Sequence, residues 1–108
     1  NDELHENEYQ CYYAFNDDGI QATIYWEKYE EQTSYENLGP KVWGYIRYFD
    51  KKPMVDEKVC EILLEYMIAY AKKHQYHALM IFGRHTRPHV LVKQGFVLDG
   101  DTYVLHLS

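Results

Sequence analysis

The chain has 108 residues, of which 46% are hydrophobic and 17% aromatic, and its formal net charge is −6. This length suits one domain with a modest core. The acidic balance, without clustered Lys and Arg, argues against a nucleic-acid backbone as partner. The longest apolar runs fall well short of the ~20 residues that a membrane-spanning helix needs, so we predict no membrane partner.

Cysteine usage bears on the cellular compartment. Cys11 and Cys60 are the only cysteines, which is typical of a reduced, intracellular protein rather than of a disulfide framework. No signal peptide is recognisable, so we predict a cytoplasmic location. The first residue is not Met, and whether the chain is a fragment of a longer protein is left open. Residues 1–108 are treated as one domain with a loose amino-terminal segment, residues 1–8.

The first half of the chain predicts an antiparallel meander. Residues 9–15 form a strand, and the Asn-Asp-Asp-Gly sequence at 16–19 forms a turn. Residues 20–29 alternate between apolar and polar side chains, as a half-buried strand does. Residues 30–40 are polar and form a loop, and residues 41–49 form the third strand. The apolar face of the second strand consists of Ile20, Ala22, Ile24 and Trp26.

The second half alternates helices and strands. Residues 56–74 have helical periodicity, with Asp56 as the N-cap. Residues 76–82 form an apolar strand that we expect to be covered on both faces. A short helix begins near Thr86, with Pro88 in its first turn, and a hairpin follows over residues 96–107. The predicted buried stripe of the long helix consists of Val59, Ile62, Leu63, Tyr66, Met67 and Tyr70.

This order of elements predicts an α/β (α+β) fold with a mixed sheet, in which the meander is followed by a β-α-β-α-β arrangement. The third and fourth strands lie parallel because a helix connects them. We expect the two strands to splay apart, and ligands of open α/β sheets bind beyond the carboxyl ends of strands at such a point.

The order and spacing over residues 55–96 resemble the GNAT superfamily of N-acetyltransferases. Residues 63–74 look like its long helix, and Gly95-Phe96 looks like the Gly-Phe pair that typically precedes its final hairpin. The resemblance implies an acyl-CoA N-acyltransferase fold, with acetyl-CoA as cofactor and an amine as substrate. It also implies that the loop before the long helix cradles a pyrophosphate, where the family has Arg/Gln-x-x-Gly-x-Gly/Ala.

The cofactor loop departs from that pattern. Val55 stands where the family has Arg or Gln, and Lys58 and Cys60 stand at its glycine positions. Asp56 and Glu57 place negative charge where the pyrophosphate would lie. An ordinary capped helix start therefore competes with a weak acetyl-CoA site. The cofactor-binding residues that the resemblance implies are Tyr48, Phe49, Val55, Lys58, Val59, Cys60 and Arg84.

Two candidates for catalysis come from the same resemblance. His85 would act as the general base on the amine, or a strand tyrosine such as Tyr48 would relay through water. Leu91 occupies the position where the family often has a tyrosine that protonates the departing thiolate. His85 and His89 have a metal-ligand spacing, but with no carboxylate or cysteine nearby we predict no metal. Cys60, at a helix start, is either a reactive thiol of lowered pKa or a small core residue.

The alternative function is a catalytically degenerate GNAT-like protein that binds a partner protein. Its docking surface would be an acidic, Tyr-rich strand face formed by Tyr25, Glu27 and Tyr29, because tyrosine is enriched at interface hot spots. The negative charge at the cofactor loop favours this alternative. The sequence does not identify the acceptor amine or the partner, and it leaves a homodimer open.

Overall fold

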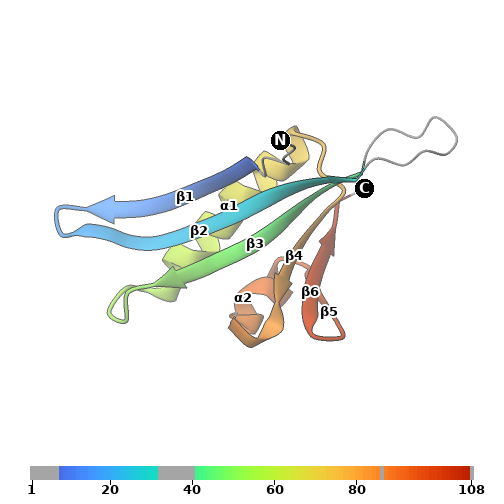
Figure 1. The fold of residues 1–108 in the computed structure, drawn as a ribbon. Coiled ribbons are helices and arrows are strands. Elements are labelled where there is room, and N and C mark those ends of the chain that lie inside the picture. The colour runs from blue at the N-terminus through green and yellow to red at the C-terminus, as the bar shows by residue number, and fades with distance from the viewer. Residues whose placement is uncertain (1–7, 32–40, 86, 108) are drawn as a thin grey trace, which may run out of the picture.

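The computed structural model describes residues 8–31, 41–85 and 87–107, omitting the side chains of Glu8 and His85. In these ranges the chain forms a mixed six-stranded sheet with two α-helices (Figure 1). The strands are β1 (Glu8–Asn16), β2 (Gly19–Glu31), β3 (Lys41–Lys51), β4 (Ala78–Phe82), β5 (Val97–Asp99) and β6 (Thr102–His106). The helices are α1 (Glu57–Lys73), α2 (Pro88–Lys93) and the 3-10 turn η1 (Gly83–His85).

The strand order across the sheet is β1-β2-β3-β4-β6-β5. Only β3 and β4 pair in parallel, and the other neighbours are antiparallel. The α+β class, the meander and the parallel pair are therefore confirmed. The loop predicted over residues 30–40 begins later than expected, because β2 runs to Glu31. The rest of that loop, residues 32–40, and residues 1–7 of the predicted loose segment lie outside the described residues. Thr86 lies outside them too, and α2 begins at Pro88.

The turn between β1 and β2 is stabilised by a hydrogen bond to the Asn16 side chain and by the backbone conformation of Gly19. The Oδ1 atom of Asn16 accepts a hydrogen bond from the Asp18 N–H at 2.8 Å, and Gly19 adopts a φ of +103°. A β-bulge leaves Gln21 without a cross-strand partner. The predicted apolar face is thus wrong at Ile20, which is exposed, because a bulge interrupts the two-residue alternation.

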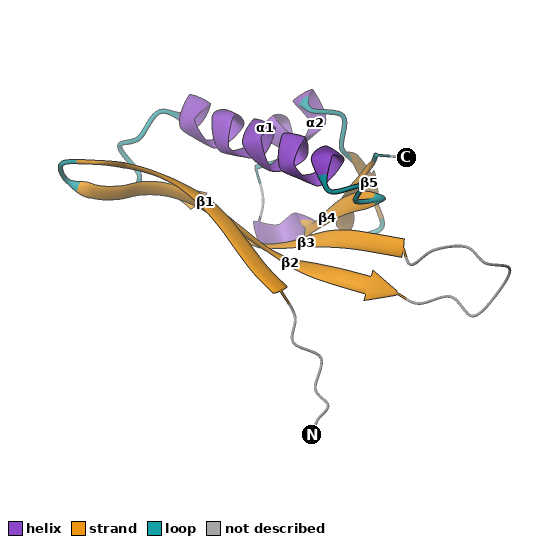
Figure 2. Cartoon of the chain, turned by 90° about the horizontal axis from the view of Figure 1, so that it is seen from above, coloured by secondary structure: helices purple, strands orange, loops and turns teal. Residues whose placement is uncertain are grey.

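The core lies between the sheet and α1, which packs over β2 and also touches β1 and β3 (Figure 2). The predicted stripe is correct at Leu63 and Met67 but wrong at Ile62 and Tyr66, which are 43% and 59% exposed. The helix is rotated so that Cys60, Leu64, Ile68 and Ala71 face the sheet, while Tyr66 keeps its hydroxyl in water. The buried residues of α1 are Cys60, Leu63, Leu64, Met67, Ile68 and Ala71.

α1 and α2 lie on the same side of the sheet (Figure 2). The prediction that β4 is covered on both faces is therefore wrong at its carboxyl end: Leu79 and Ile81 are buried, and on the other face Ala78 is buried and Met80 half-buried, but Phe82 is exposed. We call the sheet face opposite α1 the open face. Cross-strand pairing gathers on it Tyr13, Tyr25, Glu27, Tyr45 and Tyr48.

Candidate functional site

The predicted splay between β3 and β4 is present. The two strands pair only from Trp43 opposite Ala78 to Ile46 opposite Ile81, while β3 continues to Lys51 along β2. Beyond Ile46, the edge of β3 that faces β4 has no strand partner among the described residues. Alternate residues of a strand point their N–H and C=O groups to one side, so this edge presents backbone donors and acceptors to the gap.

A bulge at Arg47 marks the point where the strands part. Tyr48 pairs with Tyr25 and Ile46 with Trp26, which leaves Arg47 without a cross-strand partner. The extra residue shifts the alternation, so that Ile46 and Phe49 both turn into the core while Arg47 and Tyr48 both face outward. Bulges next to binding sites commonly re-aim side chains in this manner.

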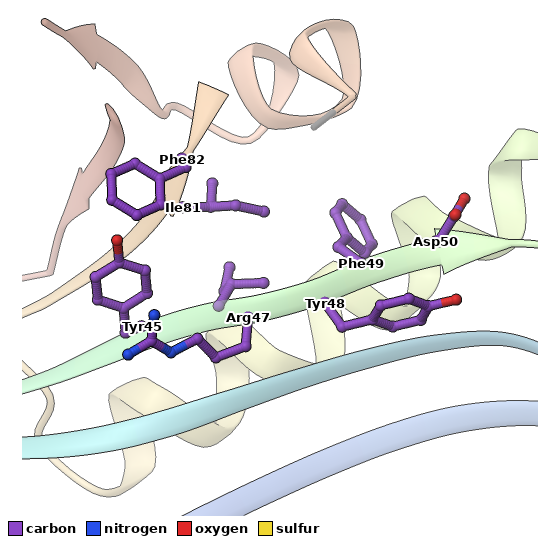
Figure 3. Close-up of a pocket in the computed structure, with 8 residues that line it drawn as sticks. Tyr45, Arg47, Tyr48, Phe49, Asp50, Ile81 and Phe82 are labelled. Carbon is purple, nitrogen blue, oxygen red and sulfur yellow. The ribbon is translucent and has the colours of Figure 1, made fainter. Parts of the chain in front are cut away.

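A cavity of about 300 Å³ occupies the gap (Figure 3). This volume is at the lower end of the range for small-molecule sites. The cavity combines aromatic walls with one cationic and one anionic side chain. Its lining consists of Tyr45, Ile46, Arg47, Tyr48, Phe49 and Asp50 from β3 and Ile81 and Phe82 from β4.

The guanidinium of Arg47 already binds side chains of the neighbouring strand residues Glu27 and Tyr29 and lies over the ring of Tyr45. Its Nε donates to Glu27 at 2.7 Å, an NH2 group donates to the Tyr29 hydroxyl at 3.0 Å, and the guanidinium lies 4.2 Å from the Tyr45 ring centroid. The hydrogen bond to Glu27 raises the pKa of Arg47, and burial raises that of Tyr45. Glu27 is 3% exposed, so it does not give the open face the acidic surface predicted from the sequence.

Asp56 caps α1 as predicted. Its Oδ1 accepts the Lys58 N–H at 2.9 Å, and its carbonyl oxygen accepts the Val59 N–H at 3.0 Å. Lys58 and Val59 are among the cofactor-binding residues that the family resemblance implies, so the backbone N–H groups of both are already engaged. A phosphate at this helix start would have to displace the Asp56 side chain to reach the Lys58 N–H.

Arg87, which the sequence analysis missed, offsets the acidic charge beside that helix start. Its guanidinium bonds both Glu57 oxygens at 3.3 and 3.1 Å and also contacts Asp50. The Lys51 Nζ lies 3.9 Å from Glu57. Only the position of Arg87, just after the carboxyl end of β4, could have pointed to it. Acidic and basic side chains thus meet beside Asp50, which lines the cavity: Asp50 and Glu57 with Lys51 and Arg87.

Cys60 is a core residue. Its side chain is fully buried, and burial raises the pKa of the thiol, with Arg87 opposing the shift less strongly. Of the two alternatives for Cys60, the small core residue is confirmed and the reactive thiol of lowered pKa is wrong, because desolvation of the thiolate outweighs nearby positive charge. Cys60 therefore contributes packing to this site, and only its backbone could serve a ligand.

The remaining predicted residues are dispersed around the gap. Tyr48 and Phe49 both line the cavity, Tyr48 with an exposed side chain and Phe49 with a buried one. His85 belongs to η1, just after β4, but its side chain lies outside the described residues. Arg84 is exposed in the same turn, and Val55 is half-buried just before Asp56.

No protein-family model matches this chain, and neither does any curated protein. The function must therefore be argued from the site itself. In the described ranges, no group of three metal-ligating side chains converges, and neither helix has the length and apolar character needed to cross a bilayer.

Proposed function

We propose that this chain is an N-acyltransferase-type domain that takes an acyl-CoA thioester into the gap between β3 and β4. One observation carries the proposal: beyond Ile46, β3 borders a cavity of about 300 Å³ with a strand edge that has no strand partner among the described residues. An extended arm with amide groups, such as the pantetheine arm of CoA, suits such an edge because it can continue the backbone hydrogen bonding.

The reaction requires little covalent chemistry from the protein. The amine nitrogen attacks the thioester carbonyl carbon, the C–S bond breaks, and the thiolate leaves and takes up a proton. The amine loses its proton to a base, for which His85 or a water beside Tyr48 is proposed. Backbone N–H groups of Tyr48 or Phe49 would stabilise the oxyanion, and the cavity would hold the two reactants together.

The diphosphate end of CoA meets a less favourable environment. Asp56 already occupies the Lys58 and Val59 N–H groups, and its carboxylate would repel a phosphate. Lys51, Lys58 and Arg87 supply the opposing charge, although Arg87 is engaged by Asp50 and Glu57. We therefore expect weak binding of CoA that depends strongly on salt concentration, because the charges around the helix start are partly exposed.

The second candidate is a partner-binding module without catalysis, which the occupied helix start favours. Its docking surface would be the open face, where exposed tyrosines lie on neighbouring strands. This surface is aromatic rather than acidic, because its carboxylate residue Glu27 is buried and paired with Arg47. Such a module would bind its partner regardless of acetyl-CoA.

Calorimetric titration with acetyl-CoA tests the proposal. Tyr48→Ala should weaken binding several-fold because Tyr48 lines the cavity. Tyr13→Ala is the matched control: the two tyrosines share the open face and have similar exposure, 53% for Tyr48 and 51% for Tyr13, but Tyr13 lies on β1. A folded protein that binds no acetyl-CoA at millimolar concentration would refute acyl transfer and favour the partner-binding module.

A further inference from the structure

The outer edge of β1 is the longer of the two sheet edges. Among the described residues, β2 is the one strand that pairs with β1, which has nine residues, whereas the opposite edge strand, β5, has three. Proteins usually protect edges with short strands, Lys, Pro or bulges, because unpaired N–H and C=O groups recruit another strand. β5 is protected because it is short. β1 contains neither Lys nor Pro, and the extra residue of the nearby bulge, Gln21, belongs to β2.

The side chains along β1 are apolar or uncharged after Glu8. On the open face, Cys11, Tyr13 and Phe15 are exposed. On the other face, the Tyr12 ring lies 5.7 Å from the ring of Tyr66 on α1. Another strand added to this edge would therefore bury apolar surface on both of its faces.

α1 exposes apolar side chains on the flank that faces this edge. Tyr66 contacts Tyr12, and Ile62 lies one turn before Tyr66 on the same side of the helix. The opposite flank is covered by α2, where Lys93 pairs with Glu61 at 3.2 Å. The apolar stripe of α1 is thus wider than one copy of the domain buries, and its uncovered part lies beside the free strand edge.

We infer that β1 is the interface of a homodimer, in which two copies pair antiparallel along β1 about a two-fold axis near Tyr12. A second copy fits this edge because antiparallel pairing is self-complementary: each strand offers the same donors and acceptors to the other. Charge favours self-pairing as well. The chain has a net charge of −6, yet β1 carries only Glu8 at its end, so the pairing opposes no like charges at its centre.

The geometry of α1 fits this arrangement. The helix packs over β2, about one and a half strand spacings, or ~7 Å, from the axis, so the two helices would lie ~14 Å apart. Helices in direct contact are about 8–10 Å apart, so large side chains are needed between them. Tyr12 and Tyr66 from each copy occupy that space. The inference concerns the edge remote from the gap between β3 and β4, and it does not depend on the proposed acyl transfer.

Sedimentation equilibrium over a range of protein concentrations tests the interface. The unmodified chain should reach the mass of two copies. Tyr13→Lys places a charge at the centre of the edge and should shift the mass to one copy. Val97→Lys is the matched control, because it places the same charge on an exposed apolar residue of β5, and it should remain dimeric. Far-UV circular dichroism establishes that both variants are folded.

Cross-linking through Cys11 tests the position of the axis. In antiparallel pairing near Tyr12, the two Cys11 residues lie opposite or diagonal to one another, within about 8 Å. A short bis-maleimide should therefore yield a covalent dimer. Cys11→Ser should abolish the product, because Cys60 is buried, and Cys11→Ser combined with Val97→Cys should not restore it.

Three results would overturn the inference. One is a mass of a single copy at every concentration. Another is a dimer that survives Tyr13→Lys but is lost in Val97→Lys. The third is growth beyond two copies with rising concentration, because a closed two-fold interface stops at the dimer.

Discussion

Truncating Leu64 and Ile62 separately tests how α1 is rotated against the sheet. The two residues are close in sequence, yet Leu64 is fully buried and Ile62 is 43% exposed. Leu64→Ala removes the side chain beyond Cβ from a closed site and should cost about 3–5 kcal/mol in the free energy of unfolding. Ile62→Ala should cost less than about 1 kcal/mol, because much of its side chain already contacts water.

Urea unfolding followed by fluorescence of the buried Trp26 measures both changes. For an m-value of about 1.5 kcal/mol/M, Leu64→Ala should lower the midpoint by about 2 M or more, and Ile62→Ala by less than about 0.7 M. The protein is kept dilute so that a second copy does not cover Ile62. Equal losses, or a larger loss for Ile62→Ala, would show that the rotation of α1 is wrong.

Two further predictions concern the start of α1. Asp56→Ala should lower the free energy of unfolding by about 0.5–2 kcal/mol through loss of the N-cap. The same change should strengthen CoA binding, because it releases the Lys58 N–H and removes a negative charge. If chemical denaturation shows no change in stability and calorimetry shows no change in CoA affinity, both roles of Asp56 are contradicted. Because burial raises the pKa of the Cys60 thiol in the folded state, its contribution to stability is complete below the unfolded pKa of about 8.5 and is lost as pH rises through the folded pKa. The free energy of unfolding should therefore decline at alkaline pH, less steeply in Cys60→Ala, and a thiol reagent should modify native Cys11 far faster than Cys60; equal rates would contradict burial of Cys60.

The sequence by itself determined the features that depend on local periodicity and turn chemistry. Alternation along residues 22–26 predicted the buried face of β2, because side chains of a strand alternate between its two faces. Asp56 at the start of a helical pattern predicted the N-cap, since a short carboxylate can accept a nearby backbone N–H. A helix between two apolar strands predicted the parallel pair, β3 and β4, because parallel strands need a crossover connection.

Only the tertiary structure decided which of several compatible surfaces are buried. The apolar stripe of α1 is wide enough for more than one rotation, and packing against the sheet selected the rotation that buries Leu64 rather than Ile62. Glu27 is buried and pairs with Arg47, the bulged residue of β3, an arrangement that no pattern of alternation encodes. Arg87 reaches Asp50 and Glu57 across 37 and 30 residues of sequence. These contacts form where β3, α1 and α2 converge, because non-local ion pairs depend on three-dimensional proximity rather than on spacing along the chain.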